Sequence, residues 1–325
     1  WDTVWTVAGR VESEYMNQFD LGGVNNVATF AMGRAATGKV GAKLVAMGWG
    51  DEFITVAGKL YAGGINNSDA GGGEDTVSVA AGMEAKGGEN YVMTGAGQDY
   101  VSVLGSVTAE EGGLNYVGTG GGNDTIFVRG SVEAGALALD AGDGYDSLVL
   151  NAESVSKFNA NYQDWLTDLA ETGDFDLMSV ESIKVDLSIP RVDHSDLGWL
   201  GDLVDAHNAA GGQNMLLELN VEHAGRNLRL SDFFSSDSDD IFTAVNMGGV
   251  VRNTLRVSGS LEENGLDAQS LRIHGEDNDT VKLSDDWSAA ERYTDAASGI
   301  SYQVYTNDSS EQLLVQSEIS VLFGA

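Results

Sequence analysis

The sequence predicts an all-β fold: a right-handed, parallel β-solenoid with three sides and about 24 residues per coil. A Gly-rich turn that runs into an alternating strand recurs five times, with start-to-start steps of 23, 24, 25 and 22 residues. Two other turn-and-strand signatures separate successive copies, so each coil has three sides. The chain also holds 43 glycines, one proline and no cysteine among 325 residues. This composition suits many tight corners and excludes a disulfide framework.

The three signatures follow one another in a fixed order. The first reads GWGDEFITV from Gly48, GGGEDTVSV from Gly71, GAGQDYVSV from Gly95, GGGNDTIFV from Gly120 and GDGYDSLVL from Gly142. The second includes VAGKLYA from Val56 and VLGSVTA from Val103, and the third includes GGINNSDA from Gly63, GGENYVMT from Gly87 and GGLNYVGT from Gly112. Alternation within the first signature places Val77, Val101 and Ile126 on one inward face. A single coil cannot bury that face, so stability must come from stacking.

The pattern divides the chain into three regions. Residues 1–150 form the repeat solenoid. Residues 151–212 are expected to be a helical insertion or cap, because apolar residues recur at helical spacing in 158–169 and 197–204. Residues 213–325 are expected to be a C-terminal region that resembles the solenoid, since GEDNDTVKL from Gly275 repeats the first signature.

The charge of the chain limits its partners. Fifty acidic and 17 basic residues give a formal net charge of −33. Such a surface repels phosphate backbones and anionic lipids, so we expect no nucleic-acid partner. No apolar run reaches the roughly 18 residues that span a bilayer, and no membrane insertion is expected. A hydrophobic content of 42% is too high for a disordered tail, so the acidic residues must decorate a folded body that attracts cations.

The Gly-x-Gly-x-Asp turns are the candidate calcium sites. Their backbone carbonyls and one carboxylate could surround a hard cation, and Ca²⁺ needs 6–8 oxygen ligands, so two stacked turns must share an ion. The candidate metal residues are Glu52, Gly71, Gly73, Asp75, Gly95, Gly97, Asp99, Gly120, Gly122, Asp124, Asp146 and Asp279. The alternative is that these acidic residues only cap the turns by accepting hydrogen bonds from backbone amides.

These turns resemble the nonapeptide repeats G-G-x-G-x-D-x-U-x of the RTX family of type I-secreted bacterial proteins. Here, however, only one corner per coil carries the Asp, which implies sparser calcium loading. Five later blocks resemble, in order, the C-terminal region of large RTX adhesins. They are MSVESIKVDLSI from Met178, NLRLSDFFSSDSDD from Asn227, NTLRVSGS from Asn253, LRIHGEDNDTVKLSDDW from Leu271 and ISYQVYTNDSSEQLLVQSEISV from Ile300. The resemblance implies an extracellular or cell-surface protein that folds in calcium after type I export.

The expected function is therefore a structural or interaction role in a surface adhesin, and not catalysis. The partner would be a cell-surface glycan, a protein or another copy of the chain. Two alternatives stay open: a lattice-forming protein of the surface-layer type, and a secreted β-helix enzyme that degrades polysaccharides. The four histidines, His194, His207, His223 and His274, form no metal or nucleophile motif, which argues against the enzyme. Trp49, Tyr91, Tyr100 and Tyr116 are expected near corners, where they either stack in ladders or contact glycans.

Overall fold

The computed structural model divides the chain into two compact units, Trp1–Glu181 and Ser182–Ala325. It describes the strands between residues 3 and 46, and then residues 48–62, 64–110, 112–130, 132, 137–151, 177–186, 204, 216–221, 227–232, 243–248, 252–264, 266, 269–296 and 298–324. Within the expected insertion, the described residues include the strands β19 (Leu177–Met178) and β20 (Ser182–Asp186). The predicted helix over 158–169 lies outside the described residues, as does all of 197–204 except Val204.

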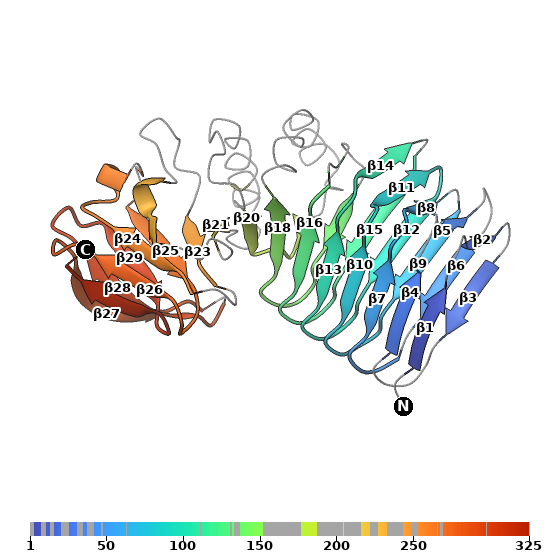
Figure 1. Ribbon diagram of the computed structural model, residues 1–325, viewed down its shortest axis with the longest axis horizontal. Helices are drawn as coiled ribbons and strands as arrows, with labels where there is room; N and C mark the ends of the chain where they lie inside the picture. The colour runs from blue at the N-terminus through green and yellow to red at the C-terminus, as the bar shows by residue number, and fades with distance from the viewer. Residues whose placement is uncertain are drawn as a thin grey trace. The chain divides into compact units, whose positions relative to one another are not determined.

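The first unit is a three-sided solenoid built from three parallel sheets. One side contains β1 (Thr3–Val7), β4 (Asn26–Phe30), β7 (Phe53–Val56), β10 (Thr76–Val79), β13 (Tyr100–Val103), β16 (Thr125–Val128) and β18 (Ser147–Asn151). The second contains β2 (Val11–Ser13), β5 (Ala35–Thr37), β8 (Leu60–Ala62), β11 (Met83–Lys86) and β14 (Val107–Glu110). The third contains β3 (Met16–Asp20), β6 (Ala42–Ala46), β9 (Ile65–Asp69), β12 (Glu89–Met93), β15 (Leu114–Gly118), β17 (Ala138–Asp140) and β19. Figure 1 shows the strands stacked from β1 in blue to β18 in green.

The strand register confirms the predicted repeat. Thr76 pairs with Phe53 on one side and with Tyr100 on the other, and Thr125 pairs with Tyr100 and Ser147. The pairing steps of 23, 24, 25 and 22 residues are those of the Gly-rich signature. The inward positions Ile54, Val77, Val101, Val103 and Ile126 are buried, while Phe53 and Tyr100 are exposed on the outer face. Stacking therefore removes the predicted apolar face from water.

An asparagine ladder fixes another corner of the first unit. The Nδ2 of Asn66 donates to Oδ1 of Asn90 at 2.6 Å, and the Nδ2 of Asn90 donates to Oδ1 of Asn115 at 2.7 Å. All three side chains are buried. The Nδ2 atoms of Asn66, Asn90 and Asn115 also donate to the backbone carbonyls of Tyr61, Glu84 and Thr108 in the second sheet, so the ladder joins neighbouring coils and also two of the three sheets.

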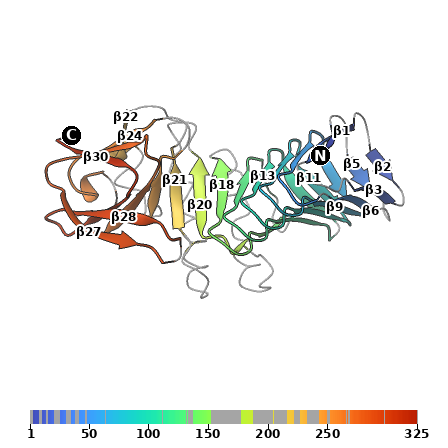
Figure 2. The same ribbon diagram turned by 90° about the horizontal axis from the view of Figure 1, so that it is seen from below.

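The second unit contains two sheets. The larger joins β20, β21 (Leu216–Asn220), β23 (Ala244–Asn246), β25 (Ser270–His274) and β29 (Gln312–Gln316) in parallel, followed by the antiparallel strands β28 (Ser301–Thr306) and β27 (Ser288–Thr294). The smaller joins β22 (Asn227–Arg229), β24 (Thr254–Val257), β26 (Thr280–Leu283) and β30 (Ser320–Phe323) in parallel. Two 3₁₀ turns, η3 (Leu230–Asp232) and η4 (Glu262–Asn264), lie between strands. Figure 2 shows the β27–β28 hairpin at the edge of this unit.

The chain of the second unit alternates between its two sheets: β21, β23, β25 and β29 belong to one, and β22, β24, β26 and β30 to the other. This region is therefore a two-sided relative of the first unit. Among the described residues, no helix has the length and apolar character needed to cross a membrane.

Candidate functional site

A row of buried carboxylates lies at one corner of the first unit, just before the strands of its first sheet. Its members are Glu52, Asp75, Asp99, Asp124, Asp146 and Glu181, and none is more than 3% exposed. The first five were predicted from the Gly-rich turns. Glu181 was missed because its turn lacks the glycines, although ESIKV from Glu181 has the same acid-and-alternation pattern as DTVSV from Asp75.

Each carboxylate after Glu52 joins its own coil to the preceding one. Oδ1 of Asp75 accepts the backbone N–H of Glu52 at 2.7 Å, and Oδ1 of Asp99 accepts the N–H of Asp75 at 2.8 Å. The same contact runs from Asp99 to Asp124 at 2.8 Å, from Asp124 to Asp146 at 2.7 Å, and from Asp146 to Oε2 of Glu181 at 2.6 Å. The carboxylates thus cap backbone amides, as the alternative interpretation expected, but the capped amide belongs to the neighbouring coil.

The second oxygen of these carboxylates, unlike the first, has no hydrogen-bond partner among the described residues. Oδ2 of Asp75, Asp99, Asp124 and Asp146, and Oε1 of Glu181, are buried and make no hydrogen bond to any described residue. An unsatisfied buried polar atom costs about 1–3 kcal/mol, and more when it carries charge. A row of such atoms indicates that the folded state favours carboxylates that are neutralised by a proton or by a cation.

The electrostatics of the row follow from burial. Burial raises the pKa of Asp75 to about 8; the backbone N–H of Glu52 opposes this rise, and the side chains of Glu52 and Asp99 add to it. Burial also raises the pKa of Asp146 to about 7; the backbone N–H of Asp124 opposes this rise, and the charges of Asp124 and Glu181 add to it. The pKa values of Asp99, Asp124 and Glu181 are likewise raised, chiefly by burial. An ionised row is therefore unfavourable in the folded state.

Threonine hydroxyls moderate two of these shifts. The Thr94 hydroxyl opposes the rise in the pKa of Asp99, and the Thr119 hydroxyl does the same for Asp124. Both hydroxyls also lie within hydrogen-bond distance of a carbonyl on the next coil, at 3.1 Å for Thr94 and 3.0 Å for Thr119. The equivalent positions before Asp75 and Asp146 are occupied by alanine, which has no hydroxyl to offer.

The candidate glycines build the corner itself. Gly95 and Gly97 have φ of 100° and 146°, and a Cβ at either would lie 1.6 Å from the carbonyl oxygen of Gly71 or Gly73. Gly71, Gly73, Gly120 and Gly122 occupy the same two columns and also have positive φ. The carbonyls of Gly71, Gly95 and Gly120 already accept an amide of the next coil, at 3.3, 2.9 and 2.7 Å. The glycines thus allow the corners to stack in close backbone contact.

The donor set of the row is made only of oxygen, which suits a hard cation. Among the described residues, however, no group of three or more acidic, histidine or cysteine side chains is gathered closely enough to hold a metal ion. Asp75, Asp99, Asp124, Asp146 and Glu181 each contribute one oxygen without a hydrogen bond to a described residue, and Ca²⁺ prefers 6–8 ligands. A cation bound here would share carboxylates from successive coils and keep water ligands.

Asp279, the remaining candidate, belongs to the second unit and is fully engaged. Its Oδ1 accepts the N–H of Asn253 at 2.8 Å, which repeats the coil-to-coil contact of the first unit. Its Oδ2 accepts the N–H of Glu276 at 3.0 Å, because the turn folds back over the carboxylate. Asp279 is therefore separate from the carboxylate row and lacks the unengaged oxygen that characterises it.

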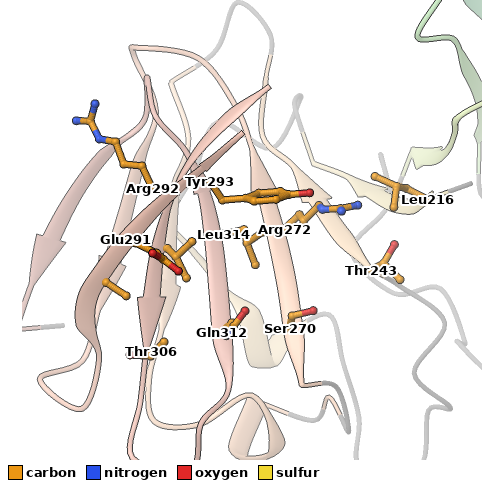
Figure 3. Close-up of a pocket in the computed structure, with 12 residues that line it drawn as sticks. Leu216, Thr243, Ser270, Arg272, Glu291, Arg292, Tyr293, Thr306, Gln312 and Leu314 are labelled. Atoms are coloured by element: carbon orange, nitrogen blue, oxygen red, sulfur yellow. The ribbon is translucent and has the colours of Figure 1, made fainter. Parts of the chain in front are cut away.

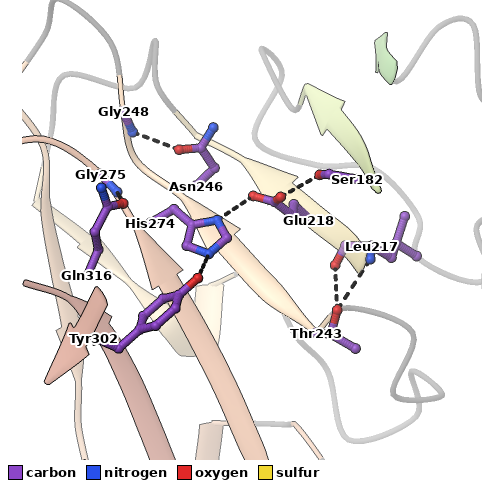
Figure 4. Close-up of polar contacts among 10 residues, drawn as sticks. All are labelled: Ser182, Leu217, Glu218, Thr243, Asn246, Gly248, His274, Gly275, Tyr302 and Gln316. Carbon is purple, nitrogen blue, oxygen red and sulfur yellow. Dashed lines mark hydrogen bonds and ion pairs between the residues drawn. The ribbon is translucent and has the colours of Figure 1, made fainter. Parts of the chain in front are cut away.

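A second polar cluster was not predicted from the sequence. His274 bridges Glu218 and Tyr302, with 2.8 Å from Nδ1 to the Glu218 carboxylate and 2.7 Å from Nε2 to the Tyr302 hydroxyl (Figure 4). The Ser182 hydroxyl donates to the other oxygen of Glu218. Its partners come from strands far apart in the sequence, which is why no short motif indicated it.

Charge and burial in this cluster suit a structural role. Burial raises the pKa of Glu218, but the charge and hydrogen bond of His274, together with Lys184 and the Ser182 hydroxyl, lower it to about 2. Burial raises the pKa of the Tyr302 hydroxyl, which is 1% exposed and so is shielded from a dissolved substrate. The cluster ties β20, β21, β25 and β28 together. His194, His207 and His223 lie outside the described residues.

Of the four aromatic residues expected near corners, two lie ring to ring and two are exposed. The rings of Tyr91 and Tyr116 are neighbours on successive coils, with centroids 5.7 Å apart, which is the predicted ladder. Trp49 and Tyr100 are instead exposed, by 84% and 41%.

In comparisons with known proteins, no family profile, no curated protein and no solved structure matches this chain.

Proposed function

We propose that this chain is an extracellular structural segment of a bacterial surface adhesin, a stiff β-solenoid whose coils close in response to calcium. The observation that carries the proposal is the carboxylate row of the first unit, in which Asp75, Asp99, Asp124, Asp146 and Glu181 each keep one buried oxygen without a hydrogen bond. Ionised carboxylates in this row make the folding free energy less favourable, and neutralised ones make it more favourable.

The size of the repulsion supports a need for counter-ions. Successive coils of a parallel sheet are about 4.8 Å apart. Two unit charges at that distance repel by about 3.5 kcal/mol at an effective dielectric constant of about 20. A few such contacts equal the net stability of an ordinary domain. An export-competent chain that stays loose without calcium would use this repulsion.

Calcium fits the row better than other common cations. Bound Ca²⁺ would supply two positive charges to neighbouring carboxylates, and it accepts irregular shells that mix protein oxygens with water. Mg²⁺ demands near-ideal octahedral geometry and sheds water reluctantly. Extracellular calcium modules have dissociation constants of about 0.1–1 mM, which is the range expected for a site with few protein ligands.

The adhesin assignment draws on two further observations. The net charge of −33 keeps the surface soluble and away from anionic membranes and nucleic acids. The C-terminal blocks from Met178 onward resemble those of type I-secreted adhesins. A stack of coils held by backbone pairing supports a spacer or display role, because each coil contacts only its neighbours and the array extends without a new core.

The test is a calcium titration of the chelated full chain, followed by far-UV circular dichroism and melting temperature. Calcium at about 1 mM is expected to raise the melting temperature by several degrees, and magnesium at the same concentration to raise it less. The variant Asp99→Asn/Asp124→Asn keeps the Oδ1 acceptors and removes two charges. It should melt higher than the natural chain in chelator and gain less from calcium. An equal, small response of both proteins to calcium would show that the row is purely structural.

A further inference from the structure

A groove of about 700 Å³ lies on the second unit, between the edge strand β27 and the outer face of the larger sheet (Figure 3). This volume is within the range of about 300–1,000 Å³ that small-molecule sites occupy. We propose that the groove binds one neutral hexopyranose unit of a polysaccharide. The groove shares no residue with the carboxylate row, so this inference does not depend on calcium binding.

The floor of the groove is made of two rows of side chains on adjacent strands. In the first row Ser270, Gln312 and Thr306 lie side by side, because Gln312 pairs with both of the others in the register of β25, β29 and β28. In the second row Arg272, Leu314 and Val304 are related in the same way. The intervening residues Leu271, Ile273, Leu313 and Val315 are buried in the core, so both rows face outward.

The wall of the groove is β27. The pairing of β27 with β28 is irregular between Ala289 and Arg292, and such a bulge bends a strand and redirects its side chains. Glu291 and Tyr293 line the groove from this strand. Arg292 also lines the groove, and Figure 3 shows its guanidinium pointing away from the other labelled side chains.

Tyr293 provides an aromatic platform. Its ring stacks on Tyr302 with centroids 6.2 Å apart and planes 25° apart, and the residue is still 42% exposed. Tyr302 is itself held by the hydrogen bond between its hydroxyl and Nε2 of His274, and by the contact of His274 with Glu218. The buried polar cluster therefore fixes the ring beneath Tyr293. A rigid, half-exposed aromatic ring suits the apolar C–H face of a pyranose.

The polar groups around this platform suit sugar hydroxyls. Arg272 is held in place by Asp295, with 3.3 Å between Nη2 and Oδ2, and both side chains remain partly accessible. Gln312 contributes an amide with donors and an acceptor, Ser270 a hydroxyl, and Glu291 a carboxylate acceptor. The planar guanidinium, amide and carboxylate groups among them can each pair with two adjacent sugar hydroxyls at once. One aromatic face and convergent hydrogen-bonding groups are the features that a pyranose ring requires, and Leu216, Val304 and Leu314 add apolar contacts.

The charges favour a neutral sugar over an acidic one. Arg272 is already paired with Asp295, and Glu291 adds a negative charge to the groove. The net charge of −33 opposes the approach of any polyanion, including uronic-acid polymers. The ligand class that meets both the platform and the charge is therefore an uncharged hexose in a chain.

The test uses the full-length chain with calcium present. Binding to a printed array of neutral and acidic oligosaccharides would identify the ligand, and titration calorimetry with the best neutral oligosaccharide would give the affinity. Tyr293→Ala is expected to weaken binding about tenfold or more, because it removes the platform. Tyr293→Phe keeps the ring and should stay within about threefold of the natural chain. The matched control is Tyr100→Ala, whose tyrosine is 41% exposed but lies in the first unit.

Three results would overturn the proposal: no neutral oligosaccharide retained on the array, retention of acidic oligosaccharides alone, or equal losses from Tyr293→Ala and Tyr100→Ala. Circular dichroism and melting temperature of each variant exclude misfolding as the cause of a loss. If calcium has no effect on stability while neutral sugars bind through Tyr293, the proposed function fails and the groove assignment stands. If calcium raises the stability but no neutral sugar binds, the groove assignment fails and the proposed function stands.

Discussion

Asp146→Asn is the sharpest test of the carboxylate row. The pKa of Asp146 is raised from the ordinary value of 3.8 to about 7, so the folded state holds this proton more tightly than the unfolded chain does. A group with a raised folded-state pKa contributes stability that is fully present below about pH 4 and is lost as the pH rises to about 7. In the natural chain without calcium, the free energy of unfolding should therefore fall across this window.

The magnitude follows from the shift. Each pH unit between the two pKa values is worth about 1.4 kcal/mol, so the raised pKa of Asp146 corresponds to at most about 4 kcal/mol. Asparagine does not titrate, and its Oδ1 can still accept the N–H of Asp124, which the carboxylate now accepts at 2.7 Å. The variant is therefore expected to match the natural chain near pH 4 and to exceed it by about 2–4 kcal/mol at pH 8.

The assay is urea unfolding in chelator at pH 4.5, 6 and 8, followed by far-UV circular dichroism. The control is Asp143→Asn, which removes an exposed carboxylate from the same turn and should change the unfolding free energy by less than about 1 kcal/mol at every pH. The reasoning is refuted if Asp146→Asn is destabilising at pH 8, or if the natural chain becomes more stable between pH 4.5 and 8 while the variant does not.

Three further predictions concern the coils. Gly97→Ala should destabilise the chain by about 3 kcal/mol or more, because its Cβ would lie 1.6 Å from a carbonyl oxygen. The control is Gly112→Ala, where φ is also positive but the space is open, and it should cost about 1 kcal/mol. Thermal unfolding of the two variants measures the difference. Asn90→Ala should cost about 2 kcal/mol or more in urea unfolding, since it interrupts the buried ladder and strands the acceptor of Asn115. Hydrogen exchange on the full chain, with and without calcium, should show amide protection changing in β10, β13 and β16 but hardly in β24 and β26.

Local repetition explains why so much of the first unit was predictable. Register in a stacked solenoid is set by the spacing of equivalent residues, so the interval from Asp75 to Asp99 in the sequence is also the interval between paired strands. The glycine corners were predictable for the same reason, since only glycine tolerates both the positive φ of Gly97 and the carbonyl beside it.

The rest depends on contacts that repetition does not encode. Glu181 joins the row after a step of 35 residues from Asp146, so no regular spacing indicates it. The bridge from His274 to Glu218 spans 56 residues, and the partner of Tyr293 is a ring on the other strand of a hairpin. The sequence also does not reveal whether the second carboxylate oxygen has a hydrogen-bond partner, because Asp75 and Asp279 occupy the same kind of turn but differ in this respect.

Asp75 of the first unit and Asp279 of the second differ in the number of hydrogen bonds that their carboxylates accept. Both carboxylates accept an amide of the preceding coil, but only Asp279 gains a second amide, from Glu276. Both oxygens of Asp279 therefore accept backbone amides of the second unit. In the first unit the charge must be balanced by a proton or a cation, so its folding free energy depends on the surroundings. We therefore expect the folding free energy of the first unit to depend more on pH and on cation concentration than that of the second.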